Sequence, residues 1–410
     1  MANVNNLKVA LVHDYLKEFG GAERVLLALH EIFPEAPIFT IFSKGRLGKL
    51  GRLGKLGEAR IIQSWFGKLP FCDRLISPLR FLIPLIWESF NFREYDLVIS
   101  SASWAITKGF GSRSITSIKD TTGITGRKRM VEICYCHTPP RYLYGYETSK
   151  DWQRHWWVRA YAAVVNHFLR IYDFQQAQKV DYFIANSKEV AGRIKKFYRR
   201  DSVVINPPVD VGGFRSASRR IGGVGKGDYF LTGGRLERAK NFDLIIKACN
   251  QLKIPLKVYG SGSQERSLRS ISGKTVEFVG KISDEERQRL MSECRAFIVA
   301  AVDEDFGITP VEAMACGKPV IAYRGGGYLE TVVEGKTGIF FYPPPSRQGG
   351  TSEGRGEPTV ESLVEVLKEF DPQKFKPEDC HKQAEKFSKT IFKKKIVEFL
   401  DSHRFKTDLH

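Results

Sequence analysis

The chain has 410 residues, which is too long for one ordinary hydrophobic core, and its 42% hydrophobic and 27% charged residues exclude an intrinsically disordered protein. A formal net charge of +18 leaves three kinds of anionic partner open: nucleic acid, an anionic membrane or a phosphorylated ligand. Seven scattered cysteines argue against a disulfide framework. We therefore expect two globular domains.

The N-terminal residues predict the start of an α/β domain. A short buried strand over residues 8–12 is followed by apolar residues at helical spacing from Val25 to Ile32. Gly20 and Gly21 lie between them, where glycine lets the backbone approach a ligand closely, and a plain tight turn is the alternative. The spacing does not match the dinucleotide-binding fingerprint, which needs a third glycine. No secretory signal is seen, so we expect a cytoplasmic protein.

Three polar stretches read as surface insertions: residues 45–57, 112–129 and 343–358. The first repeats a basic unit of six residues, which is too short to form a solenoid. Contact with phosphate or lipid and a neutral flexible loop both remain open for this repeat.

A histidine follows the second of two further predicted strands, over residues 96–101 and 130–136. At the carboxyl end of a strand, His137 can reach a ligand, although a structural histidine is the alternative. Cys134, Cys136 and His137 are residue types that bind metals, but no second Cys/His cluster completes a site. We therefore expect no metal.

Aromatic and basic residues alternate over residues 151–170. Such a stripe could lie at a membrane interface or receive a glycolipid. Aromatic residues at this spacing more often pack in a core, and we expect core packing here. A membrane-surface role nevertheless fits the net charge best, with a solvated basic face as the alternative.

The α/β pattern restarts after residues 211–227, which are rich in Gly, Ser and Arg and predict an interdomain linker. A strand ends at Gly234, and Arg235 and Lys240 bracket the loop that follows, an arrangement suited to clamping a diphosphate. Exposed charge is the alternative. A second strand ends in a glycine turn at Gly260.

An acidic loop follows the apolar run at residues 296–302, and a helix follows the loop. Glu304 lies on the loop, and Glu312 lies in the helix. Carboxylates suit sugar hydroxyls because they accept charge-assisted hydrogen bonds. The backbone N–H groups of Phe306, Gly307 and Ile308 would form an anion site at the start of the helix. A solvated acidic loop is the alternative.

The ends of this helix are also predicted. Thr309 can cap the helix with Pro310 in its first turn, and residues 316–319 end it.

The stretch from Glu304 to Val320 resembles the Glu-x7-Glu signature of retaining, GT-B-fold nucleotide-sugar glycosyltransferases, family 4 or group 1. The segment at 137–142, His-Thr-Pro-Pro-Arg-Tyr, resembles the form found in mannosyltransferase-like members. The resemblance implies that Glu304 contacts the donor sugar and that Glu312 holds the ribose. It also implies that His137 lies beside the sugar and that Arg235 and Lys240 bind the leaving diphosphate.

The resemblance further implies two Rossmann-like domains with parallel sheets that face each other across a cleft. We expect an acceptor domain at 1–210, the linker at 211–227 and a donor domain at 228–385. A last helix, within 386–410, is expected to pack back on the first domain. The loop at Gly20 and Gly21, Gly234 and Gly260 would approach the donor.

The reaction that the resemblance implies is transfer of a hexose, mannose from GDP-mannose, to a glycolipid or a polysaccharide, without metal or other cofactor. A GT-B-fold epimerase or phosphorylase, or a non-catalytic RNA- or lipid-binding protein, is the alternative. Nothing resembles a nucleic-acid-binding module, so we expect no nucleic-acid partner. Peripheral contact with an anionic membrane, at the inner face of the cell membrane, stays open.

Overall fold

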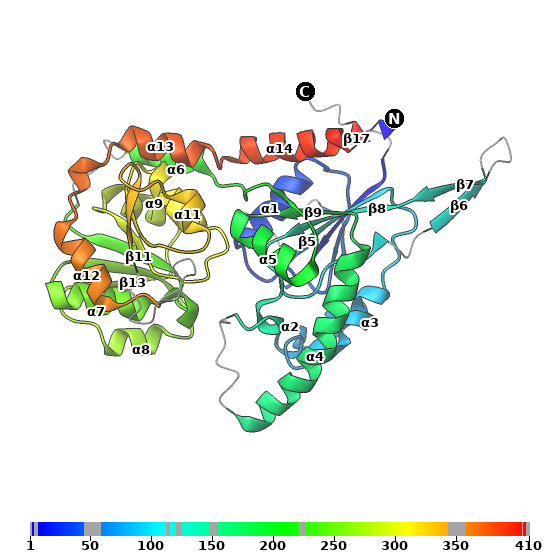
Figure 1. The fold of residues 1–410 in the computed structure, drawn as a ribbon, viewed down its shortest axis with the longest axis horizontal. Coiled ribbons are helices and arrows are strands. Elements are labelled where there is room, and N and C mark those ends of the chain that lie inside the picture. The colour runs from blue at the N-terminus through cyan, green and yellow to red at the C-terminus, as the bar shows by residue number, and fades with distance from the viewer. Residues whose placement is uncertain are drawn as a thin grey trace. The chain divides into compact units, whose positions relative to one another are not determined.

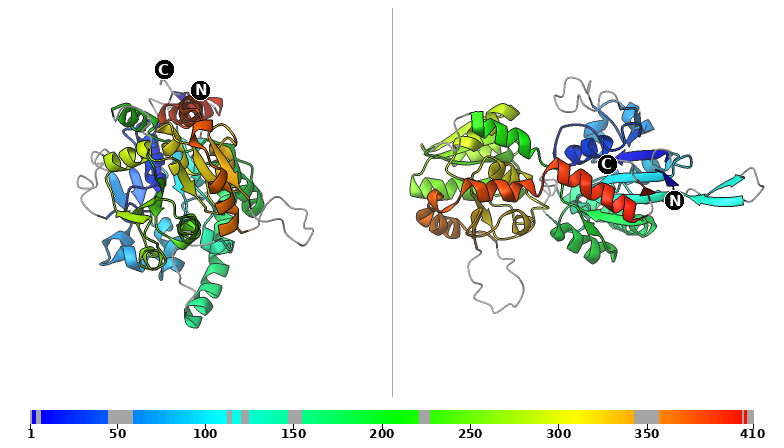
Figure 2. Two further views of the ribbon diagram at one scale, coloured as in Figure 1. Left: turned by 90° about the vertical axis from the view of Figure 1, so that its left-hand side faces the viewer. Right: turned by 90° about the horizontal axis from the view of Figure 1, so that it is seen from above.

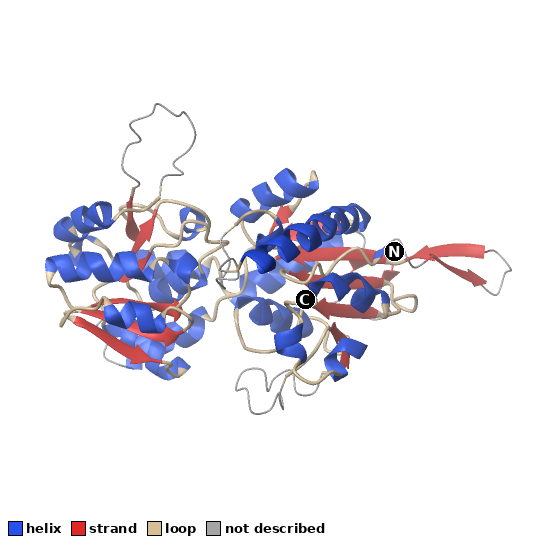
Figure 3. Ribbon diagram, turned by 90° about the horizontal axis from the view of Figure 1, so that it is seen from below, coloured by secondary structure: helices blue, strands red, loops and turns tan. Residues whose placement is uncertain are grey.

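The computed structural model describes residues 2–3, 7–44, 59–111, 115–119, 125–146, 155–220, 227–342, 357–403 and 405–406. It divides into two compact units. The N-terminal unit takes in residues up to 146, residues 152–208 and the chain from 390 onward, and the C-terminal unit includes 209–389. In each unit, helices flank one parallel sheet (Figures 1 and 3), which confirms the predicted α/β class. The 45–57 repeat and residues 343–356 lie outside the described residues.

The sheet of the N-terminal unit has the strand order β10-β9-β8-β5-β2-β3-β4, and every pairing in it is parallel. The sheet grows from β2 in both directions, so that β2 and β5 flank the point where the strand order reverses. Its strands are β2 (Val9–His13), β3 (Ile38–Thr40), β4 (Ile61–Gln63), β5 (Leu97–Ala102), β8 (Val131–Cys136), β9 (Tyr182–Ala185) and β10 (Val203–Val204).

Helices and short 3₁₀ turns cover this sheet. They are α1 (Gly21–His30), η4 (Trp65–Lys68), α2 (Cys72–Leu75), η5 (Arg80–Leu82), α3 (Ile83–Glu88), η7 (Arg141–Leu143), α4 (Trp156–Lys179), α5 (Lys188–Tyr198) and α14 (Lys389–Ser402). Two small strand pairs lie outside the main sheet: β1 (Ala2–Asn3) with β17 (Phe405–Lys406), and the antiparallel β6 (Ile115–Lys119) with β7 (Thr125–Arg129). The second pair falls within the predicted insertion at 112–129.

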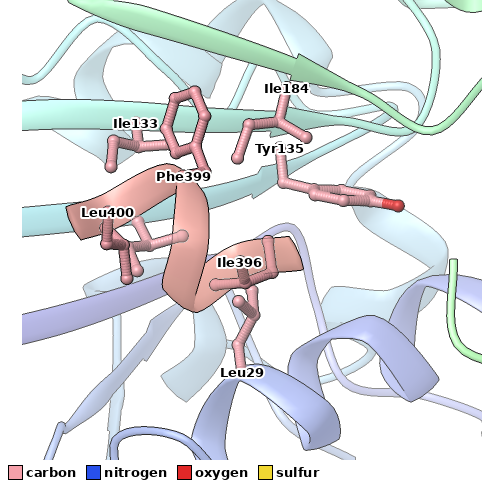
Figure 4. A pocket seen from close by; sticks show the side chains of 8 residues that line it. Leu29, Ile133, Tyr135, Ile184, Ile396, Phe399 and Leu400 are labelled. Atoms are coloured by element: carbon pink, nitrogen blue, oxygen red, sulfur yellow. The ribbon is translucent and has the colours of Figure 1, made fainter. Parts of the chain in front are cut away.

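The C-terminal helix α14 belongs to the N-terminal unit (Figure 2). Figure 4 shows Ile396, Phe399 and Leu400 of α14 against side chains of the sheet and of α1, around a small apolar pocket. Phe392 joins the same buried cluster. Apolar burial on this scale fixes the helix to the unit, since each fully buried side chain contributes about 1.5–3 kcal/mol.

The sheet of the C-terminal unit has the order β13-β12-β11-β14-β15-β16, again with parallel pairings only. Its strands are β11 (Phe230–Arg235), β12 (Leu256–Ser261), β13 (Val276–Gly280), β14 (Phe297–Val299), β15 (Val320–Tyr323) and β16 (Gly338–Phe341). Here β11 and β14 flank the reversal of strand order.

Two apolar clusters fill the two faces of this second sheet. Helices α6 (Val211–Arg220), α9 (Asp284–Glu293), α10 (Ile308–Ala315), α11 (Tyr328–Thr331) and α13 (Pro377–Glu385) contribute to one cluster. Helices α7 (Phe242–Leu252), α8 (Glu265–Ser270) and α12 (Val360–Glu369) contribute to the other. The short turns η9 (Arg238–Lys240) and η10 (Pro372–Lys374) complete the unit.

The segment predicted as a linker differs from expectation. Residues 211–220 form α6, and Val211 and Phe214 of this helix are buried in the core of the C-terminal unit. The Gly-Gly pair at 212–213 obscured the helix in the sequence, because glycine is a poor helix former. Residues 221–226 lie outside the described part of the chain.

Candidate active site

The polar residues of the C-terminal unit meet where its strand order reverses. Open parallel sheets bind ligands at this point, beyond the carboxyl ends of the two diverging strands. Lys240 follows β11, and Glu304 follows β14. Lys240 Nζ donates a hydrogen bond of 2.6 Å to Glu304 Oε2, and both side chains keep partial exposure, 36% and 16%. The structure thus brings together two of the four predicted catalytic residues.

Tyr328 is a further residue of this site that the sequence reasoning did not identify. Its hydroxyl donates to Glu304 Oε2 at 3.2 Å from the start of α11. The glycine turn before α11 lies against the acidic loop: Gly327 N donates to Glu304 O at 2.8 Å, and a Cβ on Gly327 would lie 2.3 Å from Phe306 Cα. The turn therefore fixes the backbone that carries Glu304.

The predicted donor-binding glycines Gly234 and Gly260 pair across β11 and β12. Gly260 has a φ of +113°, and a Cβ there would lie 1.9 Å from Gly234 O. Only glycine adopts this conformation without strain and leaves the two backbones this close. Arg235 comes next as the last residue of β11, with an exposed side chain at the carboxyl end of the strand.

Helix α10 begins after Gly307, which is its N-cap, so the predicted capping by Thr309 is wrong. Thr309 lies within the first turn, and Pro310 follows it as the third helical residue. Phe306 is 2% exposed, and its ring packs 5.2 Å from that of Phe387. Its side chain therefore belongs to the core, and only its backbone can serve a ligand, together with the N–H groups of Gly307 and Ile308.

Glu312 lies in a different environment from Glu304. It is fully buried in α10, and its Oε1 lies 3.4 Å from Arg287 Nη2 on α9. Burial opposes the charge on Arg287, but the negative groups around it, Glu312 foremost and then Tyr259, Asp284 and Cys316, together outweigh burial, and the pKa of Arg287 lies above its usual value. Each of the two glutamates therefore has its own cation, Lys240 for Glu304 and Arg287 for Glu312.

The N-terminal unit has a polar chain at its own reversal point. His13 ends β2, Ser101 lies beside it on β5, and His137 directly follows β8. Ser101 Oγ lies 2.8 Å from His137 Nε2 and 3.1 Å from His13 Nδ1. His137 is 8% exposed, so the predicted catalytic histidine is held at the carboxyl edge of this sheet by a buried hydroxyl.

Glu23 of α1 ends this chain, with its Oε1 3.6 Å from His13 Nε2. Its Oε2 accepts a hydrogen bond of 2.8 Å from the N–H of Gly20, which caps α1 just before Gly21. Burial alone would raise the pKa of Glu23, but the hydrogen bond and charge of His13 and the backbone N–H of Gly20 lower it below its usual value. The predicted glycine loop is therefore tied to the two histidines through Glu23.

Two buried carboxylates hold the loops beneath this chain. Asp14 accepts hydrogen bonds from Trp104 N at 2.6 Å, Ala105 N at 3.2 Å and the hydroxyl of Thr107. Glu132 accepts from the backbone N–H groups of residues 109–111, and burial raises its pKa to about 7. The sequence placed Asp14 directly after a strand, but its role in loop structure depends on contacts about 90 residues away.

Within the described residues, no group of three or more His, Cys, Asp or Glu side chains is arranged to hold a metal ion. Cys134 and Cys136 are both buried, and burial raises the pKa of the Cys134 thiol well above its usual value. That shift disfavours the thiolate, which is the form that binds metals.

Comparison with known proteins gives this geometry a context. Residues 214–349 match the model of the family "Glycosyl transferases group 1". The matched range contains the loop of Arg235 and Lys240, the acidic loop and helix α10.

The curated relatives include the human alpha-1,3/1,6-mannosyltransferase ALG2, 28% identical over 250 residues, or 53% of this chain and 58% of the human protein. The Schizosaccharomyces pombe protein of the same name is 23% identical over 81% of this chain and 70% of its own length. The chain thus spans little more than half of the human relative.

Solved structures share the fold along nearly the whole chain. Alr3699/HepE from Anabaena, in complex with UDP and glucose, matches with a TM-score of 0.63 and 18% identity, over 97% of this chain and all of that one. Sucrose-phosphate synthase from Thermosynechococcus elongatus matches with a TM-score of 0.66 and 16% identity, over 97% and 98%. The predicted GT-B fold is thereby confirmed, and within this fold residues 214–349 match the group 1 glycosyl transferase family model.

Proposed function

We propose that this protein is a glycosyltransferase that moves a hexose, mannose from GDP-mannose, to a glycolipid or polysaccharide acceptor. The observation that carries the proposal is the Lys240–Glu304 pair of 2.6 Å at the reversal of strand order within the family domain. A cation for phosphate and a carboxylate for sugar hydroxyls lie side by side there.

The proposed chemistry uses the charge that develops as the donor breaks. Arg235 and Lys240 stabilise the departing nucleoside diphosphate, because fixed cations act most strongly on charge that grows in the transition state. The backbone N–H groups at the start of α10 add to this stabilisation. Since two cations and a helix start supply the positive charge, we propose that transfer needs no metal.

The remaining contacts orient the donor. Glu304, held by Lys240 and Tyr328, accepts hydrogen bonds from the sugar hydroxyls. Glu312 is proposed to hold the ribose, with Arg287 orienting its carboxylate. His137 is proposed to contact the sugar, and Ser101 holds the position of its ring.

Mannose is proposed because relatives named alpha-1,3/1,6-mannosyltransferase match up to 81% of this chain. The His-Thr-Pro-Pro-Arg-Tyr segment supports the same sugar. The structural neighbour Alr3699/HepE was solved with UDP and glucose, which makes a UDP-sugar the alternative donor to be tested.

The test is a transfer assay with GDP-mannose and, separately, UDP-glucose, using a lipid extract as acceptor and a chelator in parallel reactions. We expect labelled mannose in the lipid fraction with and without chelator, and an anomeric configuration that is retained from the donor. Transfer of glucose from UDP-glucose, and not of mannose, would show that the donor is a UDP-sugar. Loss of transfer in chelator would overturn the metal-free mechanism, and free mannose or an epimerised nucleotide sugar as sole product would overturn transfer itself.

A further inference from the structure

The longest helix of the N-terminal unit, α4, is polar where it packs. Of its six buried residues, Asn166, Asp173 and Gln176 carry polar side chains, and the others are Ala162, Leu169 and Ala177. A surface helix ordinarily turns its apolar stripe toward the core. In α4, by contrast, half of the buried residues are polar.

Specific partners explain the polar inner face. Asp173 accepts hydrogen bonds from Tyr144, at 2.7 Å, and from the buried ammonium of Lys108. Asn166 accepts from Arg80 Nε at 2.9 Å and donates to Tyr142 O at 3.2 Å. These contacts fix which face of α4 points inward, since breaking them would leave buried charges without partners.

The outer face of α4 is correspondingly apolar. Trp157 is 59% exposed, Val164 60%, Phe168 66% and Ile171 46%. Their spacing of three, four and seven residues places them on one side of a helix. We call these four residues the α4 stripe. Core packing, expected from the sequence for the aromatic residues at 151–170, is therefore wrong for Trp157 and Phe168.

A second group of exposed apolar residues lies on the segment that packs beside α4. This group consists of Trp65, Leu69, Phe71, Phe81 and Leu85, which are between 37% and 67% exposed. The segment reaches α4 through Arg80 and through the hydroxyl of Tyr161, which donates to Pro78 O.

Phe71 is the most exposed member of this group, and it adopts φ 56° and ψ 25°. The left-handed region is strained for a large side chain and is often kept for a functional reason. Phe71 therefore has a strained backbone although its ring is mostly exposed to solvent.

The charges around these apolar residues are mainly positive. Asp173 is the one acidic residue in the sequence of α4, and it is buried against Lys108. On the neighbouring segment Lys68 and Arg74 are exposed, and the guanidinium of Arg74 lies 5.9 Å from the centre of the Phe71 ring. Arginine and lysine beside exposed tryptophan and phenylalanine are typical of helices that lie in a bilayer interface.

We propose that the α4 stripe and the apolar residues between Trp65 and Leu85 form a surface that docks on an anionic lipid bilayer. Among the described residues, no helix is long and apolar enough to cross a membrane, so α4 would lie in the interface plane. A second copy of the chain fits this surface less well, because it would bring Lys68 and Arg74 against like charges. The inference does not rest on the proposed glycosyl transfer.

The test is co-sedimentation of the full chain with vesicles of phosphatidylcholine and phosphatidylglycerol in equal parts, and with vesicles of phosphatidylcholine alone. The test variant is Val164→Ser/Phe168→Ser/Ile171→Ser. Its three sites are exposed, so the fold should tolerate them, and thermal unfolding checks this. The matched control is Val203→Ser, which changes an apolar residue that is 47% exposed on β10 of the same unit.

We expect the wild type and Val203→Ser to bind anionic vesicles and to be released by salt. The triple variant should bind more weakly by roughly tenfold for each large apolar side chain lost. Equal binding by the triple variant and the wild type, or a concentration-dependent dimer that the triple variant abolishes without any vesicle binding, would overturn the proposal. Nucleotide binding should be unchanged in the triple variant, which separates this outcome from failure of the proposed activity.

Discussion

The two units place different polar groups at the same point of a similar sheet. Each has a parallel sheet whose strand order reverses, at β2 and β5 in one unit and at β11 and β14 in the other. In the C-terminal unit this point carries a partly exposed ion pair, Lys240 with Glu304. In the N-terminal unit it carries a buried chain of polar side chains through His13, Ser101 and His137.

This difference in exposure indicates which unit can bind the charged diphosphate. A partly exposed ammonium on a loop can exchange its carboxylate partner for a phosphate at small cost, because surface ion pairs contribute little. The buried chain of the N-terminal unit cannot reorganise so easily, since every polar group in it would need a new partner. We therefore assign diphosphate binding to the C-terminal unit and positioning of His137 to the N-terminal one.

The largest expected effect comes from Lys240→Ala. Removing a cation aimed at developing charge should lower the transfer rate by about 10²–10³-fold. The matched control is Lys247→Ala, which removes an exposed lysine paired with Asp243 on α7 of the same unit. Steady-state rates with the donor at saturation measure the effect, and equal rates for the two variants would argue against a role for Lys240 in the chemistry.

Glu312→Gln should act on stability more than any exposed change. It removes one of the two carboxylates beside the largely buried guanidinium of Arg287 and leaves the other, that of Asp284, so the free energy of unfolding should fall by about 2 kcal/mol. Glu265→Gln breaks the exposed pair with Arg269 and should cost less than about 0.5 kcal/mol. Denaturant unfolding compares the two, and similar midpoints would show that the Glu312 pair is not structural.

Ser101→Ala tests the buried chain of the N-terminal unit. Loss of the shared hydroxyl should cost about 1 kcal/mol of stability and release His137, which should shift the pH dependence of the transfer rate. Ser101→Thr, which keeps a hydroxyl, should restore the profile. The matched control is Ser100→Ala, which removes a neighbouring hydroxyl that contacts Glu132 and not His137. Its pH profile of the transfer rate should match that of the wild type. An unchanged pH profile in Ser101→Ala would show that Ser101 does not position His137.

The smallest expected effect is the dependence of the free energy of unfolding on pH that Glu23 and Glu132 cause. The pKa of Glu23 is lower in the folded protein than in the unfolded chain, so its contribution is present above the unfolded value of 4.5 and is lost as pH falls through the folded value. Glu23→Gln should flatten this acid limb. Glu132 has the opposite sign: its pKa of about 7 means that stability declines as pH rises from 4.5 to 7. Unfolding midpoints across pH measure both, and an acid limb unchanged in Glu23→Gln would contradict the first.

Much of the fold and part of the site could be predicted from local patterns. Buried strands and the residues directly after them are visible in sequence, which is why Lys240 and Glu304 were identified and do meet. Tyr328 and Arg287 were missed because their partners lie 24 and 25 residues away and the contacts are set by packing. Helix α6 was hidden by its glycines, and α4 departs from the usual rule because Asp173 and Asn166 bury their polar groups.

The most direct test of the central assignment is a calorimetric titration of GDP, without metal, into the wild type, Lys247→Ala and Arg235→Ala/Lys240→Ala. We expect the wild type and Lys247→Ala to bind GDP alike. The double variant should bind more weakly by about a hundredfold, since two charge-assisted contacts to the diphosphate are lost. Equal GDP affinity in the double variant and the wild type would contradict the assignment of diphosphate binding to the reversal point of the C-terminal sheet.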